Sequence, residues 1–224
     1  SSTIVCADAN LPKAAPLVVN AGFRKAGQVC TSVQRLYVQR PIIEEFSAAL
    51  TESLEGRVVG DPRAEGAFVG PLIDKASATR VSTWIDEAIQ GGARRVIGGE
   101  LNGSVLTPTI LTDVTRGMKV MDQEIFGPVI VLRPFDDLAE AVTEANDTPY
   151  GLSAGIFTSN VDTALWAAEH MEVGTFHVNE TSSTRVDLMP FGGVKASGTG
   201  LEGPAYAVRE MSVERLVTLG ASGI

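Results

Sequence analysis

Short runs of β-branched and other apolar residues alternate along the chain with longer amphipathic stretches. A short apolar run bounded by turn residues is typical of a buried strand, and apolar positions recurring near every 3.6 residues are typical of a helix. The alternation predicts an α/β fold, a mainly parallel sheet flanked by helices in three layers. We expect strands at residues 3–6, 34–39, 95–97, 109–111, 129–132, 152–157, 175–178 and 213–219.

Capping residues mark where helices begin. Pro12 falls in a first turn after Asn10, where its missing N–H is not needed. Asp74 can accept hydrogen bonds at a helix start, and Asp137 with Glu140 has the spacing of a capping box. These signals predict helices at about residues 11–25, 41–55, 74–90, 137–146, 161–171 and 201–209.

Composition narrows the class of protein. The 224 residues fit one large domain or two small ones, and 44% hydrophobic with 20% charged residues is a globular composition. No apolar run approaches the roughly 20 residues that cross a bilayer, so we expect no membrane partner. A net charge of −9 repels phosphate and argues against nucleic-acid binding. Two distant cysteines favour a reducing compartment, the cytoplasm, and two histidines with no cysteine nearby predict no metal site.

Cys30 is the main candidate for chemistry. It lies in the sequence AGQVCTS at residues 26–32, among glycine, glutamine, threonine and serine. A thiol is a strong nucleophile only as thiolate, which requires a polar, partly open site. Cys6 lies in the apolar run IVCA and is expected to be buried and inert. An inert buried thiol is also the alternative interpretation of Cys30.

Two further segments carry candidate residues. Glu124 and Phe126 belong to EIFGPV at residues 124–129, which places an acid and an aromatic ring beside a chain turn. Taken alone, Glu124 is one more surface acid. The sequence PFGGVK at residues 190–195 opens a glycine-rich stretch that continues to residue 203 and is expected to form a mobile or ligand-facing loop.

These three segments, in this order and at these separations, resemble the aldehyde dehydrogenase superfamily over nearly the whole chain. The resemblance implies that Cys30 attacks the aldehyde, with a thiohemiacetal and a thioester as intermediates, and that its own N–H helps to hold the oxyanion. It implies that Glu124 accepts hydrogen bonds from the nicotinamide ribose of NAD or NADP, and that Phe126 packs beside the nicotinamide. It implies that Phe191 lines the aldehyde tunnel, the alternative being a loop anchor packed on the core. Asn179 matches a residue that orders the active-site loops, although a plain strand-end asparagine is nearly as good an interpretation.

The resemblance also indicates what is missing. In the family, a glutamate that acts as general base closely precedes a strand like residues 3–6, in a Glu-Leu-Gly motif, and no such motif stands ahead of Ser1. No glycine-rich loop has the spacing that cradles a pyrophosphate. We therefore expect a catalytic thiol domain at residues 1–211, no N-terminal dinucleotide-binding domain, and no dehydrogenase activity from the chain alone. Residues 212–224 are expected to be the C-terminal strand of an oligomerisation arm, and the full enzyme a homodimer or homotetramer.

The aldehyde is less well defined. Residues 182–190 resemble family branches that act on lactaldehyde, phosphonoacetaldehyde, glyceraldehyde 3-phosphate or succinate semialdehyde. Arg185 could direct its guanidinium at an anionic tail of the aldehyde, a geometry that arginine suits. The alternative is a structural ion pair with Asp187 or another nearby acid.

Two other functions stay open. A cysteine-dependent hydrolase or acyl-transfer domain would need a base within this chain, and neither His170 nor His177 stands in a recognisable Cys-His signature. A non-catalytic assembly module would keep the fold only as an interaction surface. The intact Cys30, Glu124 and Phe191 argue against that module.

Overall fold

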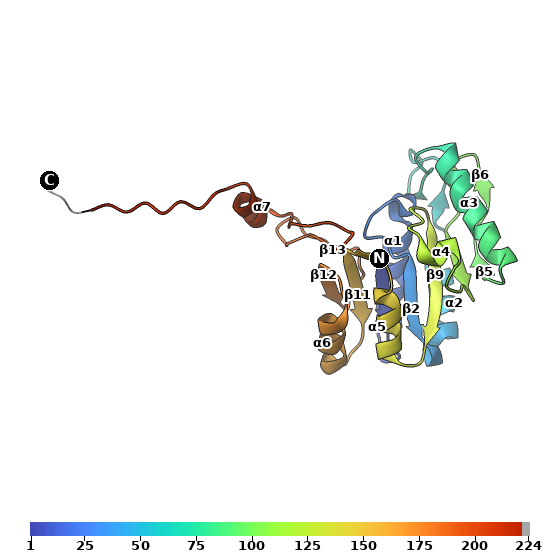
Figure 1. Cartoon of the computed structure of the whole chain (residues 1–224). Coiled ribbons are helices and arrows are strands. Elements are labelled where there is room, and N and C mark those ends of the chain that lie inside the picture. Colours follow the sequence, from blue (N-terminus) through green and yellow to red (C-terminus); the bar gives the residue numbers. More distant parts are fainter. Residues whose placement is uncertain (221–224) are drawn as a thin grey trace.

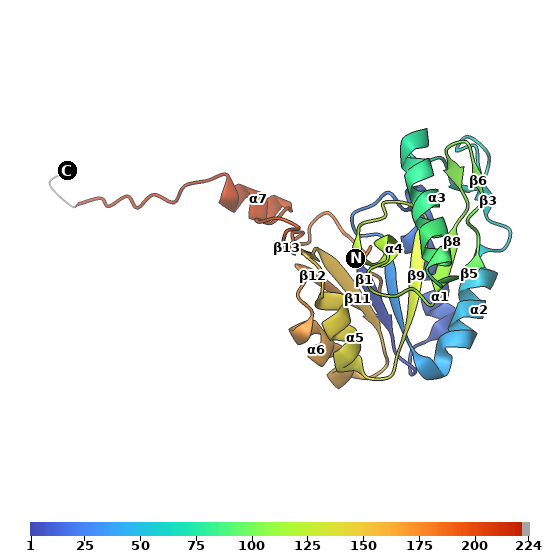
Figure 2. The ribbon, with the colours of Figure 1, turned by 45° about the vertical axis from the view of Figure 1, so that its right-hand side comes forward.

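Seven strands form the central sheet, with helices on both faces (Figure 1, Figure 2). The computed structural model describes residues 1–220. The strand order is β12-β11-β1-β2-β9-β8-β5, and every neighbouring pair is parallel except β8 with β5 at one edge. This confirms the mainly parallel α/β prediction. The strands are β1 Ser2–Val5, β2 Arg35–Gln39, β5 Arg94–Ile97, β8 Thr109–Thr112, β9 Val129–Phe135, β11 Ser153–Phe157 and β12 Thr175–Val178.

The longer helices follow the predicted order, and several small elements were not predicted. The helices are α1 Leu11–Phe23, α2 Ile43–Leu54, α3 Lys75–Gln90, α4 Lys119–Asp122, α5 Leu138–Asn146, α6 Val161–His170 and α7 Pro204–Glu210. Two short 3₁₀ turns are η1 Arg24–Gly27 and η2 Arg40–Ile42. Small two-stranded sheets pair β3 Val58–Val59 with β4 Ala67–Val69, β6 Leu101–Asn102 with β7 Val105–Leu106, and β10 Tyr150–Gly151 with β13 Val194–Lys195.

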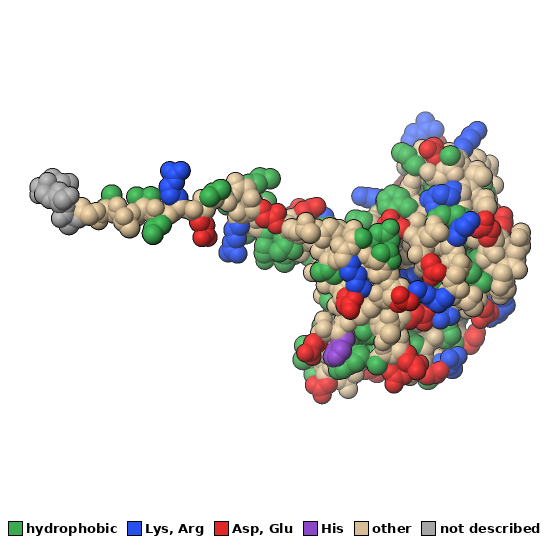
Figure 3. All heavy atoms as spheres, viewed as in Figure 1, with side chains coloured by type: hydrophobic (Ala, Val, Ile, Leu, Met, Phe, Trp, Pro, Cys, Tyr) green, Lys and Arg blue, Asp and Glu red, His purple; other side chains and the backbone are tan. Residues whose placement is uncertain are grey.

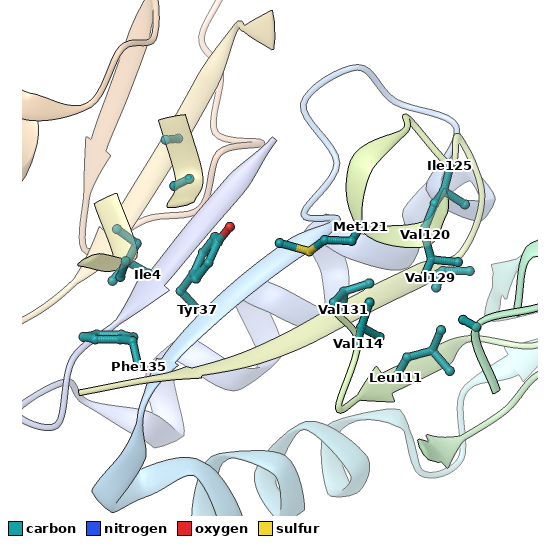
Figure 4. Packing of buried hydrophobic residues seen from close by; sticks show 14 of the residues in the cluster. Ile4, Tyr37, Leu111, Val114, Val120, Met121, Ile125, Val129, Val131 and Phe135 are labelled. Carbon is teal, nitrogen blue, oxygen red and sulfur yellow. The ribbon is translucent and has the colours of Figure 1, made fainter. Parts of the chain in front are cut away.

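The core consists of two apolar clusters, one on each face of the sheet. Successive strand residues alternate between them: Ile4 belongs to one cluster and Val5 to the other. The cluster of Ile4 also contains Tyr37, Val129 and Val131 (Figure 4). It includes buried side chains of α3, α5 and α6. The second cluster packs against α1 and α2. Because both faces are covered, the strands read as continuous apolar runs.

The predicted caps are present. Asn10 accepts a hydrogen bond from the N–H of Lys13 at 3.1 Å, and Asp74 accepts one from Ser77 at 2.7 Å. Asp137 caps α5 in the same way. Helix α1 ends at Phe23, short of the predicted residue 25, because Arg24 leaves the helical path with φ −54° and ψ 144° and Lys25 is left-handed. Each cap is worth about 1 kcal/mol.

The C-terminal segment does not form the strand expected at residues 213–219. Helix α7 and residues 211–220 extend away from the body (Figure 1, Figure 3), and Val213, Leu216 and Leu219 are 95%, 89% and 94% exposed. A strand requires a neighbouring backbone for its hydrogen bonds, and none of residues 1–220 supplies one here. Residues 221–224 of the expected arm lie outside the described residues.

Acidic and basic side chains are interleaved on the face of the body shown in Figure 3. Among the described helices, none is long and apolar enough to cross a lipid bilayer.

Candidate functional site

Cys30 lies in a turn at the amino end of β2. The chain leaves α1, passes through Lys25, Ala26 and Gly27 with φ values of 54°, 55° and 67°, and reaches Cys30 five residues before the strand. Three successive left-handed residues reverse the chain direction, so the cysteine is placed at the amino-terminal edge of the parallel strands. Open α/β sheets usually bind ligands at the opposite, carboxyl edge.

Hydrogen bonds on either side of Cys30 hold this turn. The Ser32 hydroxyl donates to the carbonyls of Ala21 and Gly22 in α1, both at 3.1 Å. The Ser182 hydroxyl donates to the Thr31 carbonyl at 2.8 Å. Thr31 and Ser32 are therefore buried, whereas the Cys30 side chain is exposed. Within residues 1–220 the Cys30 N–H donates to no acceptor, so it is free to bind a substrate oxygen.

Glu124 and Phe126 are positioned by the buried residue between them. Ile125 is 1% exposed and reaches into the core beside Val120 and Met121 (Figure 4). Because neighbouring side chains in an extended segment point to opposite sides, this anchor turns Glu124 and Phe126 outward. Phe126 is 43% exposed and has a left-handed φ of 50°.

The loops that carry Cys30 and Glu124 are in direct backbone contact. A Cβ atom on Gly27 would lie 2.1 Å from the carbonyl oxygen of Gly127, far inside van der Waals contact. Gly27 also has a positive φ of 67°, which disfavours any side chain. Glycine is therefore required at position 27 for two independent reasons.

The structure brings three predicted site residues together. Cys30, Glu124 and Phe126 line one small hollow beside Gly27 and Gly127. Cys30 and Glu124 also border a cleft of about 240 Å³. Its other walls come from residues 1–2, 34–35, 121–123, 145–146, 148, 150–153, 171–173 and 196–197. A thiol, a carboxylate and an aromatic ring thus face one accessible space.

The side chains of Arg185 and Phe191 pack against each other and form a second unit. Neither residue lines the hollow or the cleft described above. The Arg185 guanidinium lies 4.2 Å from the ring centroid of Phe191, which is 9% exposed. Phe191 also forms a β-bridge to Glu202. The ion pair considered for Arg185 with Asp187 or another nearby acid forms with Glu202, at 2.9 Å. Phe191 therefore serves as a packing surface for Arg185.

Serine hydroxyls link the second unit to the turn at Cys30. Ser183 lies 3.2 Å from the Thr31 hydroxyl and accepts a hydrogen bond from Arg24 at 2.7 Å. Together with the bond from Ser182 to Thr31, this attaches the segment before Arg185 to the residue after the thiol. Sequence reasoning did not identify these serines as site residues, because isolated hydroxyls carry no periodic signal.

The two histidines lie away from Cys30. His177 pairs with Gly155 in β11, which pairs with Thr3 in β1, which pairs with Leu36 in β2. Three strand spacings separate it from β2 by roughly 14 Å. Burial lowers the pKa of His177. His170 stacks on Trp166 at the end of α6.

Cys6 and Asn179 have structural roles. Cys6 is 6% exposed, and burial, followed by the nearby Asp8 charge, raises its pKa to about 12. Asn179 accepts a hydrogen bond from the Thr158 N–H at 3.1 Å, at the carboxyl edge of the sheet. It therefore orders a turn opposite to Cys30, as a strand-end asparagine. Among residues 1–220, no three histidine, cysteine or acidic side chains are grouped to hold a metal ion.

The profile of the aldehyde dehydrogenase family matches residues 1–217. The chain belongs to this family. As a family member, it is 47% identical to the 3-sulfolactaldehyde dehydrogenase of Priestia aryabhattai over 219 residues, 98% of this chain and 46% of that protein. It is 39% identical to the sulfoacetaldehyde dehydrogenase of Neptuniibacter caesariensis over 216 residues, 96% of the chain and 47% of the relative.

Solved structures of family members show the same fold. The NADP-dependent glyceraldehyde-3-phosphate dehydrogenase of Bacillus halodurans, complexed with NADP, superposes with a TM-score of 0.94 at 36% identity. The match covers 99% of this chain and 46% of that one. This aldehyde dehydrogenase chain therefore spans about half the length of the relatives it matches.

Proposed function

We propose that this chain is the catalytic portion of an NAD(P)-dependent aldehyde dehydrogenase, with its thiol domain at residues 1–211. The observation that carries the proposal is the shared hollow in which the exposed Cys30 meets Glu124 and Phe126. Membership of the family is consistent with these roles. A working thiol also favours the reducing environment of the cytoplasm.

In this proposal Cys30 supplies the nucleophile. Its thiolate adds to the aldehyde carbon and forms a thiohemiacetal, and the unbonded Cys30 N–H stabilises the negative oxygen. A dinucleotide held at its nicotinamide end by Glu124 and Phe126 would supply the oxidising power by taking a hydride from the thiohemiacetal carbon. The resulting thioester on Cys30 is hydrolysed by water, which releases the carboxylic acid and restores the thiol.

Glu124 and Phe126 fit the nicotinamide end of a dinucleotide. Within residues 1–220 the Glu124 carboxylate receives no hydrogen bond, so it can accept from both hydroxyls of a ribose. Phe126 offers an exposed ring in the same hollow. The outward position of both side chains supports their assignment to the cofactor.

The test of the thiol uses the full-length gene product that contains this segment. Cys30→Ser should lower kcat for NAD(P)-dependent aldehyde oxidation by at least about a thousandfold, because no other group can form the thioester. Cys6→Ser is the matched control and should leave kcat unchanged, since Cys6 is buried away from the hollow. Retention of activity in Cys30→Ser would rule out the mechanism.

We also propose that the aldehyde has an anionic tail that binds Arg185. Two relatives are named for aldehydes that carry a sulfonate, and Arg185 is 44% exposed with only part of its donors engaged by Glu202. Phe191 supports the guanidinium by packing its ring against it. This geometry supports recognition of a sulfonate, phosphate or carboxylate.

Replacing Arg185 tests the anionic tail. In the full-length gene product, Arg185→Ala should raise KM for a charged aldehyde by about tenfold relative to an uncharged one of similar size. Arg40→Ala is the control, because its ion pair with Asp136 lies on a different part of the surface. An unchanged KM ratio in Arg185→Ala would exclude the role.

The hydrolase alternative has little structural support. Its general base would have to come from this chain, and both histidines lie away from the hollow that contains Cys30. Loss of any esterase activity in His177→Ala would nonetheless revive it. The assembly-module alternative predicts instead that Cys30→Ser has no catalytic effect.

For assembly, we propose that residues 212–224 supply a strand to a neighbouring subunit, as in the arm of the family, in a homodimer or homotetramer. The described part of this segment is extended, exposed and rich in apolar side chains. In the full-length gene product, Val217→Pro removes a backbone donor in the middle of the expected strand. This variant should be monomeric in size exclusion with light scattering. Ser212→Pro, just outside the strand, is the control. A monomeric wild-type protein would refute the arm.

A further inference from the structure

We propose that Gln34 is a positioning residue, which holds Glu124 in place through the backbone on both sides of it. Its side chain bonds the peptide groups that flank Glu124 and does not engage the Glu124 carboxylate. The inference rests on the proposed role of Glu124 as the acceptor for the ribose.

The Gln34 side-chain amide makes three hydrogen bonds to one short segment. Its nitrogen donates to the carbonyl of Gln123 at 2.7 Å and to that of Val120 at 3.1 Å. Its oxygen accepts from the N–H of Ile125 at 3.0 Å. The carbonyl before Glu124 and the N–H after it are therefore fixed by one side chain.

These bonds explain why helix α4 stops where it does. The helix ends at Asp122, and Gln123 is extended, with φ −114° and ψ 156°. In a longer helix, the Val120 carbonyl would accept from the N–H of Glu124. Gln34 supplies that donor instead, which satisfies the carbonyl and frees Glu124 to leave the helical path.

A second side chain holds the carbonyl of the same residue, Ile125. Arg80 in α3 donates to the carbonyl of Ile125 at 2.8 Å, and its guanidinium lies 4.6 Å from the ring centroid of Trp84. Ile125 is thus held at its N–H by Gln34 and at its carbonyl by Arg80. The carbonyl held by Arg80 immediately precedes Phe126, whose backbone is left-handed.

The position of Gln34 connects the two halves of the site. It lies four residues after Cys30 and 91 residues before Ile125. It also lines both the hollow and the cleft that Cys30 and Glu124 border. A side chain at position 34 must therefore reach residues 120–125 and offer one acceptor and two donors to their backbone. Glutamate offers acceptors only, and methionine has similar length without either function.

The chain itself offers a matched control. Gln39 lies in the same strand, β2, and its side-chain oxygen also accepts from a backbone N–H, that of Ala7 at 2.7 Å. That bond lies at the carboxyl end of the strand. Gln39→Met therefore removes a comparable hydrogen bond without altering the surroundings of Glu124.

Amide hydrogen exchange on the 224-residue chain tests the positioning directly. Gln34→Met should speed exchange at the Ile125 N–H by at least about tenfold, because the acceptor that this group has among residues 1–220 is lost. Gln39→Met should leave Ile125 exchange unchanged. Unchanged exchange in Gln34→Met overturns the inference. If Gln34→Met does not fold, Gln34→Asn is measured instead, because its amide is one methylene shorter and does not reach the Ile125 N–H; faster exchange at Ile125 is again expected, and an unchanged rate overturns the inference.

Kinetics of the full-length gene product then test whether positioning matters for binding. Gln34→Met should raise KM for NAD(P) by about tenfold and leave KM for the aldehyde within about twofold, because only the Glu124 loop moves. Equal rises in both KM values would indicate general loosening and overturn the inference. A different pair of results would refute the proposed function alone. If Gln34→Met speeds Ile125 exchange but the wild-type full-length gene product never reduces NAD(P), the structural role of Gln34 stays intact.

Discussion

Replacement of Gly27 by alanine should disrupt the contact between the two site loops. The new Cβ would lie 2.1 Å from the Gly127 carbonyl oxygen and 2.4 Å from its carbon, and both of these are backbone atoms that cannot rotate away. Overpacking of this kind costs about 1–3 kcal/mol. The left-handed φ of 67° adds about 1–2 kcal/mol for any residue with a side chain. The total loss in unfolding free energy should therefore be about 2–5 kcal/mol.

Gly56→Ala separates the two contributions. Gly56 has a similar φ of 70°, but a Cβ there would meet nothing within 4 Å. The restriction of the unfolded chain is the same in both variants and cancels. Urea unfolding should therefore show Gly27→Ala to be about 1–3 kcal/mol less stable than Gly56→Ala. Equal unfolding midpoints for the two variants would refute the claim that the loops touch through Gly27.

Three further predictions follow from burial and charge. Burial raises the pKa of Cys6 from 9.0 to about 12, so near neutral pH its thiolate fraction is about a thousandth of that of a cysteine with a pKa of 9.0. Iodoacetamide should therefore modify the exposed Cys30 first, and equal rates of modification by mass spectrometry would contradict this. Burial lowers the pKa of His177, so the folded protein favours the neutral ring and loses stability as pH falls through the ordinary histidine pKa of about 6.5. His177→Gln should therefore flatten the dependence of unfolding free energy on pH between about 7 and 5, and an unchanged slope would show that another group causes it. Arg133→Ala should cost about 2 kcal/mol in urea unfolding, because it leaves the half-buried Glu144 without its partner, and a loss below about 0.5 kcal/mol would show that solvent already screens the pair.

Most element positions were predictable because burial imposes a local pattern. The apolar runs at residues 3–6 and 175–178 gave β1 and β12, and side-chain caps such as Asp74 marked helix starts. The extent of β9 was underestimated. Arg133 and Pro134 interrupt its apolar run, yet pairing with β2 continues to Phe135. Here the partner strand, which is distant in sequence, sets the end of the element.

The C-terminal segment shows how far a local pattern depends on a partner. Its apolar residues at 213–219 have a strand-like pattern, but no strand forms in the described chain because no backbone lies beside it. The ion pair of Arg185 also depends on the fold. The sequence left open Asp187 or another nearby acid as its partner, and the loop brings Glu202 to the guanidinium.

The reactive groups could be read from the order of residues: the thiol of Cys30 in a polar stretch, the acid and ring on either side of Ile125, and the glycine-rich stretch at residues 190–203. Only the folded chain shows that Gly27 meets Gly127 and that Gln34 bonds the backbone around Glu124. The physical reason is the range of the interactions. Burial and capping act within a few residues and leave a periodic trace, whereas a side-chain hydrogen bond to a peptide group 91 residues away leaves none.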